Sequence, residues 1–161
     1  MNLFDAHVTQ LDKCLFTKTG DFTNGQWIQK ELYRAVPAGL CGMDDYGTME
    51  GWYVTSVLGY GEVDPVSGYY EIGSPLFPKA TIRRQGASSG TFTIEAHNVS
   101  DTNQYIQSAT LNGKPLREAR FRQTDMVAGG SLIFEMGPMP NQHWGIGPDH
   151  AQRQDRLSPD Q

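Results

Sequence analysis

Two adjacent carboxylates, Asp44 and Asp45, are the residues of this chain whose types and surroundings could do chemistry. They lie in a turn rich in glycine, with Gly39, Gly42 and Gly47 on either side. Because glycine adopts backbone angles that other residues avoid, such a loop can hold a short carboxylate at the start of a helix. A carboxylate there can take a proton from water, or it can accept hydrogen bonds from free backbone amides.

The residue types alone favour the second role, helix capping, for Asp45. The apolar residues that follow recur at helical spacing: Met49, Trp52, Tyr53 and Val57. They predict an amphipathic helix from about Gly47 to Leu58. An Asp just before such a run commonly caps it, and its replacement by Ala would cost about 1 kcal/mol. Catalysis is the alternative role for Asp45.

Two further helices are expected upstream of this turn. Apolar residues at helical spacing predict the first over residues 3–16. The second follows a capping-box pattern, Thr23-x-x-Gln26, and runs to about Val36. Pro37 ends it, because the residue before a proline is pushed out of helical geometry.

After Gly59 the apolar period changes to two, which is typical of half-buried strands. The alternating pairs are Tyr70 and Ile72, Ala80 and Ile82, Phe92 and Ile94, and Ile106 and Ser108. Asn112-Gly113 predicts a two-residue hairpin turn of type I′. Residues 125–130 read as a turn or short helical turn, and Leu132–Phe134 as a final strand.

The chain is therefore expected to be α+β, with N-terminal helices followed by a small antiparallel β-sandwich. We assign residues 1–60 to the helical segment, 61–140 to the β region and 141–161 to a disordered tail in which Trp144 is idle. Four other aromatic residues could stack on sugars, but core positions are the better interpretation. They are Trp52, Tyr53, Tyr69 and Tyr70.

Composition excludes several classes of function. The formal net charge of −5 argues against nucleic acid as the main partner, because phosphate binding needs a basic face. No apolar run is long enough to span a membrane, and the first residues do not form a signal peptide, so the localisation stays unknown. The two cysteines, Cys14 and Cys41, do not imply a disulfide, and Cys41 is expected to be a small buried apolar group.

The turn and the helix after it resemble the C-terminal signature of glycoside hydrolase family 92. The matching residues are Leu40-Cys41-Gly42, Asp44-Asp45, Gly47, Met49 and Trp52-Tyr53-Val54. Further segments resemble the family in the expected order: Tyr70–Phe77, Thr91–Ala96, Tyr105–Pro115 and Gly129–Met136. The resemblance covers roughly residues 26–140.

The resemblance implies a calcium-dependent, inverting exo-α-mannosidase that acts on mannose-containing glycans. It implies that residues 1–60 are the last part of an (α/α)6 catalytic barrel and that Asp45 is the general base. Asp44 stands where the family usually has Glu, with an uncertain role, and Met43 stands where it usually has Asn or Asp. The family's proton-donor segment, Glu-Gly-Asn-Ala-Trp-Gln-Tyr, does not occur in these 161 residues.

These departures lead to three hypotheses. The chain is expected to be a C-terminal fragment of an α-mannosidase, inactive alone, with an incomplete calcium site and the rest of a barrel as a possible partner. The alternatives are a non-catalytic carbohydrate-binding or structural β-sandwich, and a degenerate gene product. Whether the chain is itself an enzyme stays open at the level of the sequence.

Overall fold

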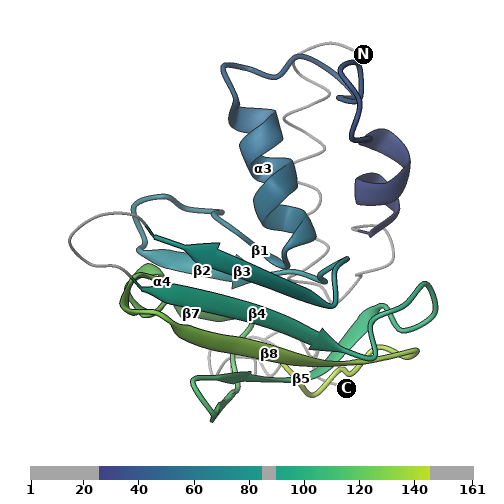
Figure 1. Cartoon of the computed structure of the whole chain (residues 1–161). Coiled ribbons are helices and arrows are strands. Elements are labelled where there is room, and N and C mark those ends of the chain that lie inside the picture. Colours follow the sequence, from purple (N-terminus) through teal and green to yellow (C-terminus); the bar gives the residue numbers. More distant parts are fainter. Residues whose placement is uncertain (1–25, 85–89, 146–161) are drawn as a thin grey trace, which may run out of the picture.

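The chain folds into a helical part that stands on one side of a β region. A computed structural model describes residues 26–84 and 90–145. Figure 1 shows η1 (Ile28–Leu32) and α3 (Thr48–Val57) together on one side of the strands. This arrangement confirms the predicted α+β class. The helix expected over residues 3–16 and the tail from residue 146 lie outside the described residues.

The strands form two sheets. The first has the order β1-β2-β7, formed by β1 (Tyr60–Gly61), β2 (Tyr69–Ile72) and β7 (Arg120–Arg122). The second has the order β3-β4-β8-β5-β6, formed by β3 (Lys79–Arg83), β4 (Thr91–His97), β8 (Gly130–Gly137), β5 (Tyr105–Leu111) and β6 (Lys114–Leu116). A short helix, α4 (Gln123–Ala128), connects the two sheets where a turn or helical turn was predicted.

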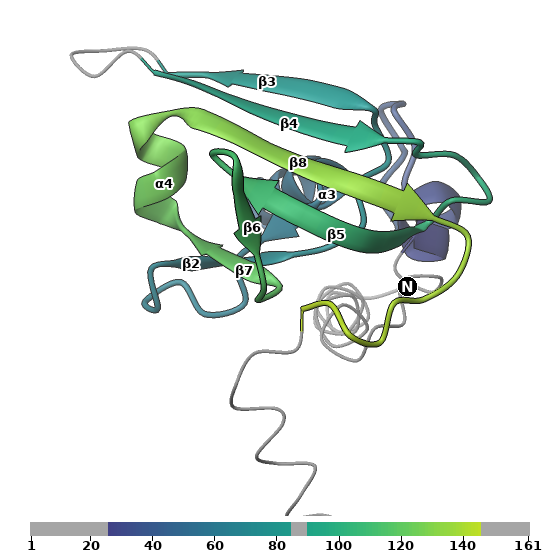
Figure 2. The ribbon, with the colours of Figure 1, turned by 90° about the horizontal axis from the view of Figure 1, so that it is seen from below.

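One pair of strands departs from the expected antiparallel arrangement. β8 pairs parallel to β4, from Phe92 opposite Gly130 to His97 opposite Glu135. Figure 2 shows β8 between β4 and β5, with α4 at the end where β8 begins. A parallel pair needs a long connection rather than a hairpin. Here β5, β6, β7 and α4 all intervene between β4 and β8.

The hairpin prediction was right, but the alternation expected in β5 breaks. Asn112 and Gly113 have φ of 51° and 76°, as a two-residue turn between β5 and β6 requires. Upstream, the register with β8 shifts between Ile106 and Ser108. Because of this bulge Ser108 is exposed, and Ala109 takes the core position instead.

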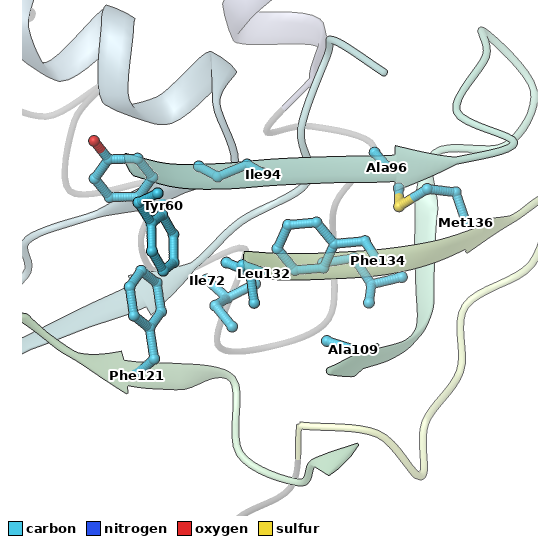
Figure 3. Packing of buried hydrophobic residues seen from close by; sticks show 11 residues of the cluster. Tyr60, Ile72, Ile94, Ala96, Ala109, Phe121, Leu132, Phe134 and Met136 are labelled. Atoms are coloured by element: carbon cyan, nitrogen blue, oxygen red, sulfur yellow. The ribbon is translucent and has the colours of Figure 1, made fainter. Parts of the chain in front are cut away.

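Side chains of both sheets meet in one apolar core. Figure 3 shows Tyr60 and Phe121 of the smaller sheet beside Ile94, Leu132 and Phe134 of the larger one. The rings of Phe92 and Phe121 stack with centroids 5.9 Å apart, which joins the two sheets directly. Burial of this surface is the main force that holds the β region together.

The polar sequence around Trp144 had suggested that this residue has no structural role. The structure shows that it has one. Its ring packs against the core, and its indole Nε1 donates a hydrogen bond to the carbonyl of Leu116 over 2.9 Å. The segment after β8 is thus attached to the β region at this point.

The second predicted helix ends four residues early. η1 stops at Leu32, and Tyr33 is already extended, with φ −126° and ψ 140°. The backbone then closes a tight turn, in which the amide of Arg34 donates to the carbonyl of Gly39 over 2.9 Å. A Cβ on Gly39 would lie 1.8 Å from the carbonyl oxygen of Arg34, so only glycine fits there.

The helices contain no candidate membrane span. None of those in the described ranges 26–84 and 90–145 has the length and apolar character that crossing a bilayer requires.

Candidate functional site

The turn before α3 has an unusual backbone. Three successive residues adopt left-handed angles: Asp45 at φ 53°, Tyr46 at 59° and Gly47 at 88°. Residues other than glycine take this conformation only at a cost of about 1–2 kcal/mol each. Such conformations persist where surrounding contacts enforce them, and they cluster at functional sites.

The side chain of Asp44, the neighbour of the residue expected to cap, accepts amides at the start of α3. One carboxylate oxygen of Asp44 accepts the amide of Gly47 over 2.6 Å, and the other accepts the amide of Glu50 over 3.0 Å. The main-chain carbonyl of Asp44 accepts the amide of Met49 over 3.0 Å. These contacts form because the left-handed turn lies between Asp44 and the helix and folds these amides back onto Asp44.

One aromatic ring just after η1 packs against two rings of α3. Tyr33 is buried, with its ring stacked on Tyr53 at 5.0 Å between centroids and tilted against Trp52 at 5.2 Å. Burial raises the pKa of the Tyr33 hydroxyl above its usual value, and the adjacent Cys41 adds to the rise. Cys41 is a free, half-buried thiol rather than the fully buried group that was expected.

Two buried glutamines tie η1 to its neighbours. The Gln26 amide donates to the Ser74 hydroxyl over 2.6 Å, and Ser74 donates to the carbonyl of Gln104 over 2.7 Å. The Gln29 amide donates to the Ser56 hydroxyl of α3 over 3.3 Å. Sequence reasoning missed this set, because a glutamine in a helical pattern is normally read as an exposed position.

The four aromatic residues that could stack on sugars fall into two groups in the structure. Trp52 is buried, and Tyr53 and Tyr70 pack against the two apolar clusters, so these three are core residues. Tyr69 differs, because its ring lies against the guanidinium groups of Arg120 and Arg122, at 4.9 and 5.1 Å from the ring centroid. Tyr69 is therefore already engaged by cations on the smaller sheet.

The described residues do not fit a calcium ion by themselves. Calcium takes roughly six to eight oxygen ligands. Within 26–84 and 90–145, no three His, Cys, Asp or Glu side chains form a group that could hold a metal. The two carboxylate oxygens of Asp44 already accept amide hydrogen bonds.

The other carboxylate, Asp45, lies on the turn itself. Both oxygens of Asp44 are engaged by the backbone, and the half-buried Asp45, which makes an interaction of its own, sits on the left-handed turn itself. An ionised carboxylate so placed can accept a proton from a water molecule. Asp44 and Asp45 are neighbours on one turn, so they are not two carboxyl groups on opposite sides of a bond.

Comparison with known proteins finds a family whose model includes this turn. The model of the glycosyl hydrolase family 92 catalytic domain matches residues 23–138. A search among curated proteins found no match.

Solved structures of this family are similar in fold. The GH92 α-mannosidase BT3965 of Bacteroides thetaiotaomicron, in complex with mannoimidazole, is 27% identical with a TM-score of 0.74, over 86% of this chain and 18% of its own. The inverting mannosidase BT2199 of the same organism is 30% identical with a TM-score of 0.68, over 88% and 17%. The glycosyl hydrolase ccman5 is 25% identical with a TM-score of 0.73, over 86% and 22%.

The chain thus spans about a fifth of the length of these structures, and the matched part includes the turn, α3 and both sheets. Because the family model matches well over half of the chain, the chain belongs to glycosyl hydrolase family 92.

Proposed function

We propose that this chain supplies the general-base loop of an inverting α-mannosidase, with Asp45 as the carboxylate that takes a proton from the attacking water. The observation that carries the proposal is the left-handed turn at Asp45–Gly47, which lies inside the region matched by the family. Strain of this kind is retained where it serves a function. One structural relative is an inverting mannosidase, which favours inversion here.

Inversion needs a second carboxyl group about 6.5–9.5 Å from the base, to protonate the leaving oxygen. The family's donor segment does not occur in the 161-residue sequence. We therefore propose that the chain alone does not turn over a mannoside. The substrate class, α-mannosides of glycans, follows from family membership and is part of the proposal.

We propose calcium dependence only for a complete family-92 active site, not for this chain by itself. Within 26–84 and 90–145, no three His, Cys, Asp or Glu side chains are grouped so that they could hold the ion. An ion that assists the reaction would take its ligands from other groups, and its removal should leave the fold of residues 26–84 and 90–145 unchanged.

The proposal is tested by assaying the purified chain for mannose release from an aryl α-mannoside, with and without added calcium. We expect no release, because general acid catalysis typically contributes 10²–10⁴-fold and its donor segment is lacking. Calcium-dependent release that disappears in Asp45→Asn would show that the chain holds a complete site and would overturn this part of the account.

A non-catalytic role, in binding or structure, is the competing function. The observation that favours it is that the larger apolar core lies in the β region rather than around the turn. A binding module would contact a glycan through its strands. A general-base loop would contact it at residues 44–48, so the position of the contact separates the two.

A further inference from the structure

The polar contacts around the turn centre on one side chain, that of Asp44. The carboxylate of Asp44 spans the left-handed segment and joins its last residue, Gly47, to the first turn of α3 at Glu50. The carbonyl of Asp45 accepts the amide of Thr48 over 3.3 Å, so the main chain closes the same ring. The turn is thus held by two hydrogen bonds to the side chain of Asp44 and one to the carbonyl of Asp45.

These contacts oppose the strain of the turn. Asp45 and Tyr46 are both non-glycine residues at positive φ. Each would relax to a right-handed or extended conformation if the turn were released. Hydrogen bonds from amides to a charged carboxylate are among the stronger ones in proteins. Two such bonds from one side chain can therefore hold the turn in its strained form.

We propose that Asp44 is a positioning residue whose carboxylate locks the left-handed turn and thereby sets the backbone from which Asp45 acts. The inference rests on the proposed function of Asp45, and it assigns to the adjacent carboxylate a different role. The positioning role is assigned to Asp44 because each of its two carboxylate oxygens accepts an amide of the chain.

Position 44 needs a side chain with two acceptor oxygens, because two amides donate to it. An Asn at position 44 keeps one acceptor oxygen but presents an NH₂ group to the second amide, so it can satisfy only one of Gly47 and Glu50. An Ala keeps neither bond. Asp44→Asn should therefore lie between the wild-type chain and Asp44→Ala.

The test is an NMR comparison of the ¹⁵N-labelled full chain with its Asp44→Asn and Asp44→Ala variants. The intraresidue amide–Hα NOE of Asp45 and Tyr46, which is strong at positive φ, should weaken in Asp44→Asn and be lost in Asp44→Ala. Amide exchange at Gly47 and Glu50 should become about tenfold faster in Asp44→Ala, equivalent to about 1.4 kcal/mol.

Asp64→Ala is the matched control. Asp64 accepts the amide of Val66 over 3.1 Å in another exposed loop, where neither Val66 nor Ser67 has positive φ. Its loss should leave the NOEs of Asp45 and Tyr46 as in the wild type.

A purely structural cap would give a different pattern. In that case Asp44→Ala would destabilise α3 while Asp45 kept its strong NOE, and this result would overturn the inference. The measurement uses no sugar and no turnover. The NMR result can therefore be interpreted even if the proposed mannosidase function is wrong. If Asp44 does not hold the turn, the proposed function of Asp45 is still tested separately by sugar binding.

Discussion

At the scale of single residues, His97 at the end of β4 is the clearest pH-sensitive group. Its Nδ1 lies 2.6 Å from Glu135 of β8, and its Nε2 lies 3.6 Å from Glu95, which pairs with Lys79 at 2.7 Å. The hydrogen bond to Glu135 is the main cause that raises the pKa of His97 above its usual 6.5. The hydrogen bond and charge of Lys79 lower the pKa of Glu95, so that carboxylate stays ionised in mild acid.

We predict that His97→Gln lowers the melting temperature at pH about 5.5 and leaves it unchanged at pH about 8.5. A histidine with a raised pKa stabilises the fold fully below its unfolded pKa, and this contribution is lost as the pH rises through the folded value. Thermal unfolding of both chains across this range is the measurement. Glu135→Gln should show the same pH dependence, and a difference that is constant with pH would contradict the assignment.

At the scale of elements, one glycine inside α3 and one just before it test how the backbone conformation of the helix and of the turn selects their residues. Gly51 lies in the helix interior and Gly47 precedes it at φ 88°, and an added Cβ would meet nothing within 4 Å at either position. The two sites therefore differ in backbone conformation rather than in space.

We predict opposite effects for the same substitution at these sites. Gly51→Ala should stabilise the chain by about 0.5–1 kcal/mol, because glycine is costly inside a helix. Gly47→Ala should destabilise it by about 1–2 kcal/mol, because alanine is strained in the left-handed region. The measurement is the denaturation midpoint with an unchanged slope. Equal signs would mean that the left-handed turn does not exist in solution.

The elements also show what the sequence could predict. α3 and the strands follow from apolar periods, and the hairpin follows from Asn112-Gly113, because these signals are local. The parallel pairing of β8 with β4 is set by which strands meet after a long connection. The early end of η1 depends on Tyr33 turning into an aromatic cluster. No local pattern records either event.

For the candidate site too, some features could be predicted from the sequence and others depend on the fold. The glycine-rich turn and its two carboxylates stand out in the sequence, and so does the resemblance that singles out Asp45. That the side chain of Asp44 reaches two amides across the left-handed turn depends on the fold of that turn. Residue types alone could not decide this, because Asp44 and Asp45 are identical and adjacent.

At the scale of the whole molecule, the core between the sheets should dominate stability. Phe134 lies on β8, between β4 and β5, and is fully buried. We predict that Phe134→Ala costs about 3–5 kcal/mol, from lost burial and the cavity left behind. Phe77→Ala is the control, because Phe77 is 52% exposed and its loss should change stability by about 0.5 kcal/mol or less. Comparable losses from chemical denaturation of the two variants would contradict the packing described here.

The central claim, that the turn before α3 is the mannoside-facing part of this chain, is tested most directly by NMR titration. The ¹⁵N-labelled chain is titrated with methyl α-D-mannopyranoside, with the α-glucoside as the control sugar. The account predicts saturable shifts of the amides from Asp44 to Thr48 with the mannoside alone, and weaker shifts in Asp45→Asn. Shifts confined to the strands would favour a binding module, and the absence of any mannoside-specific change at the turn would contradict the account.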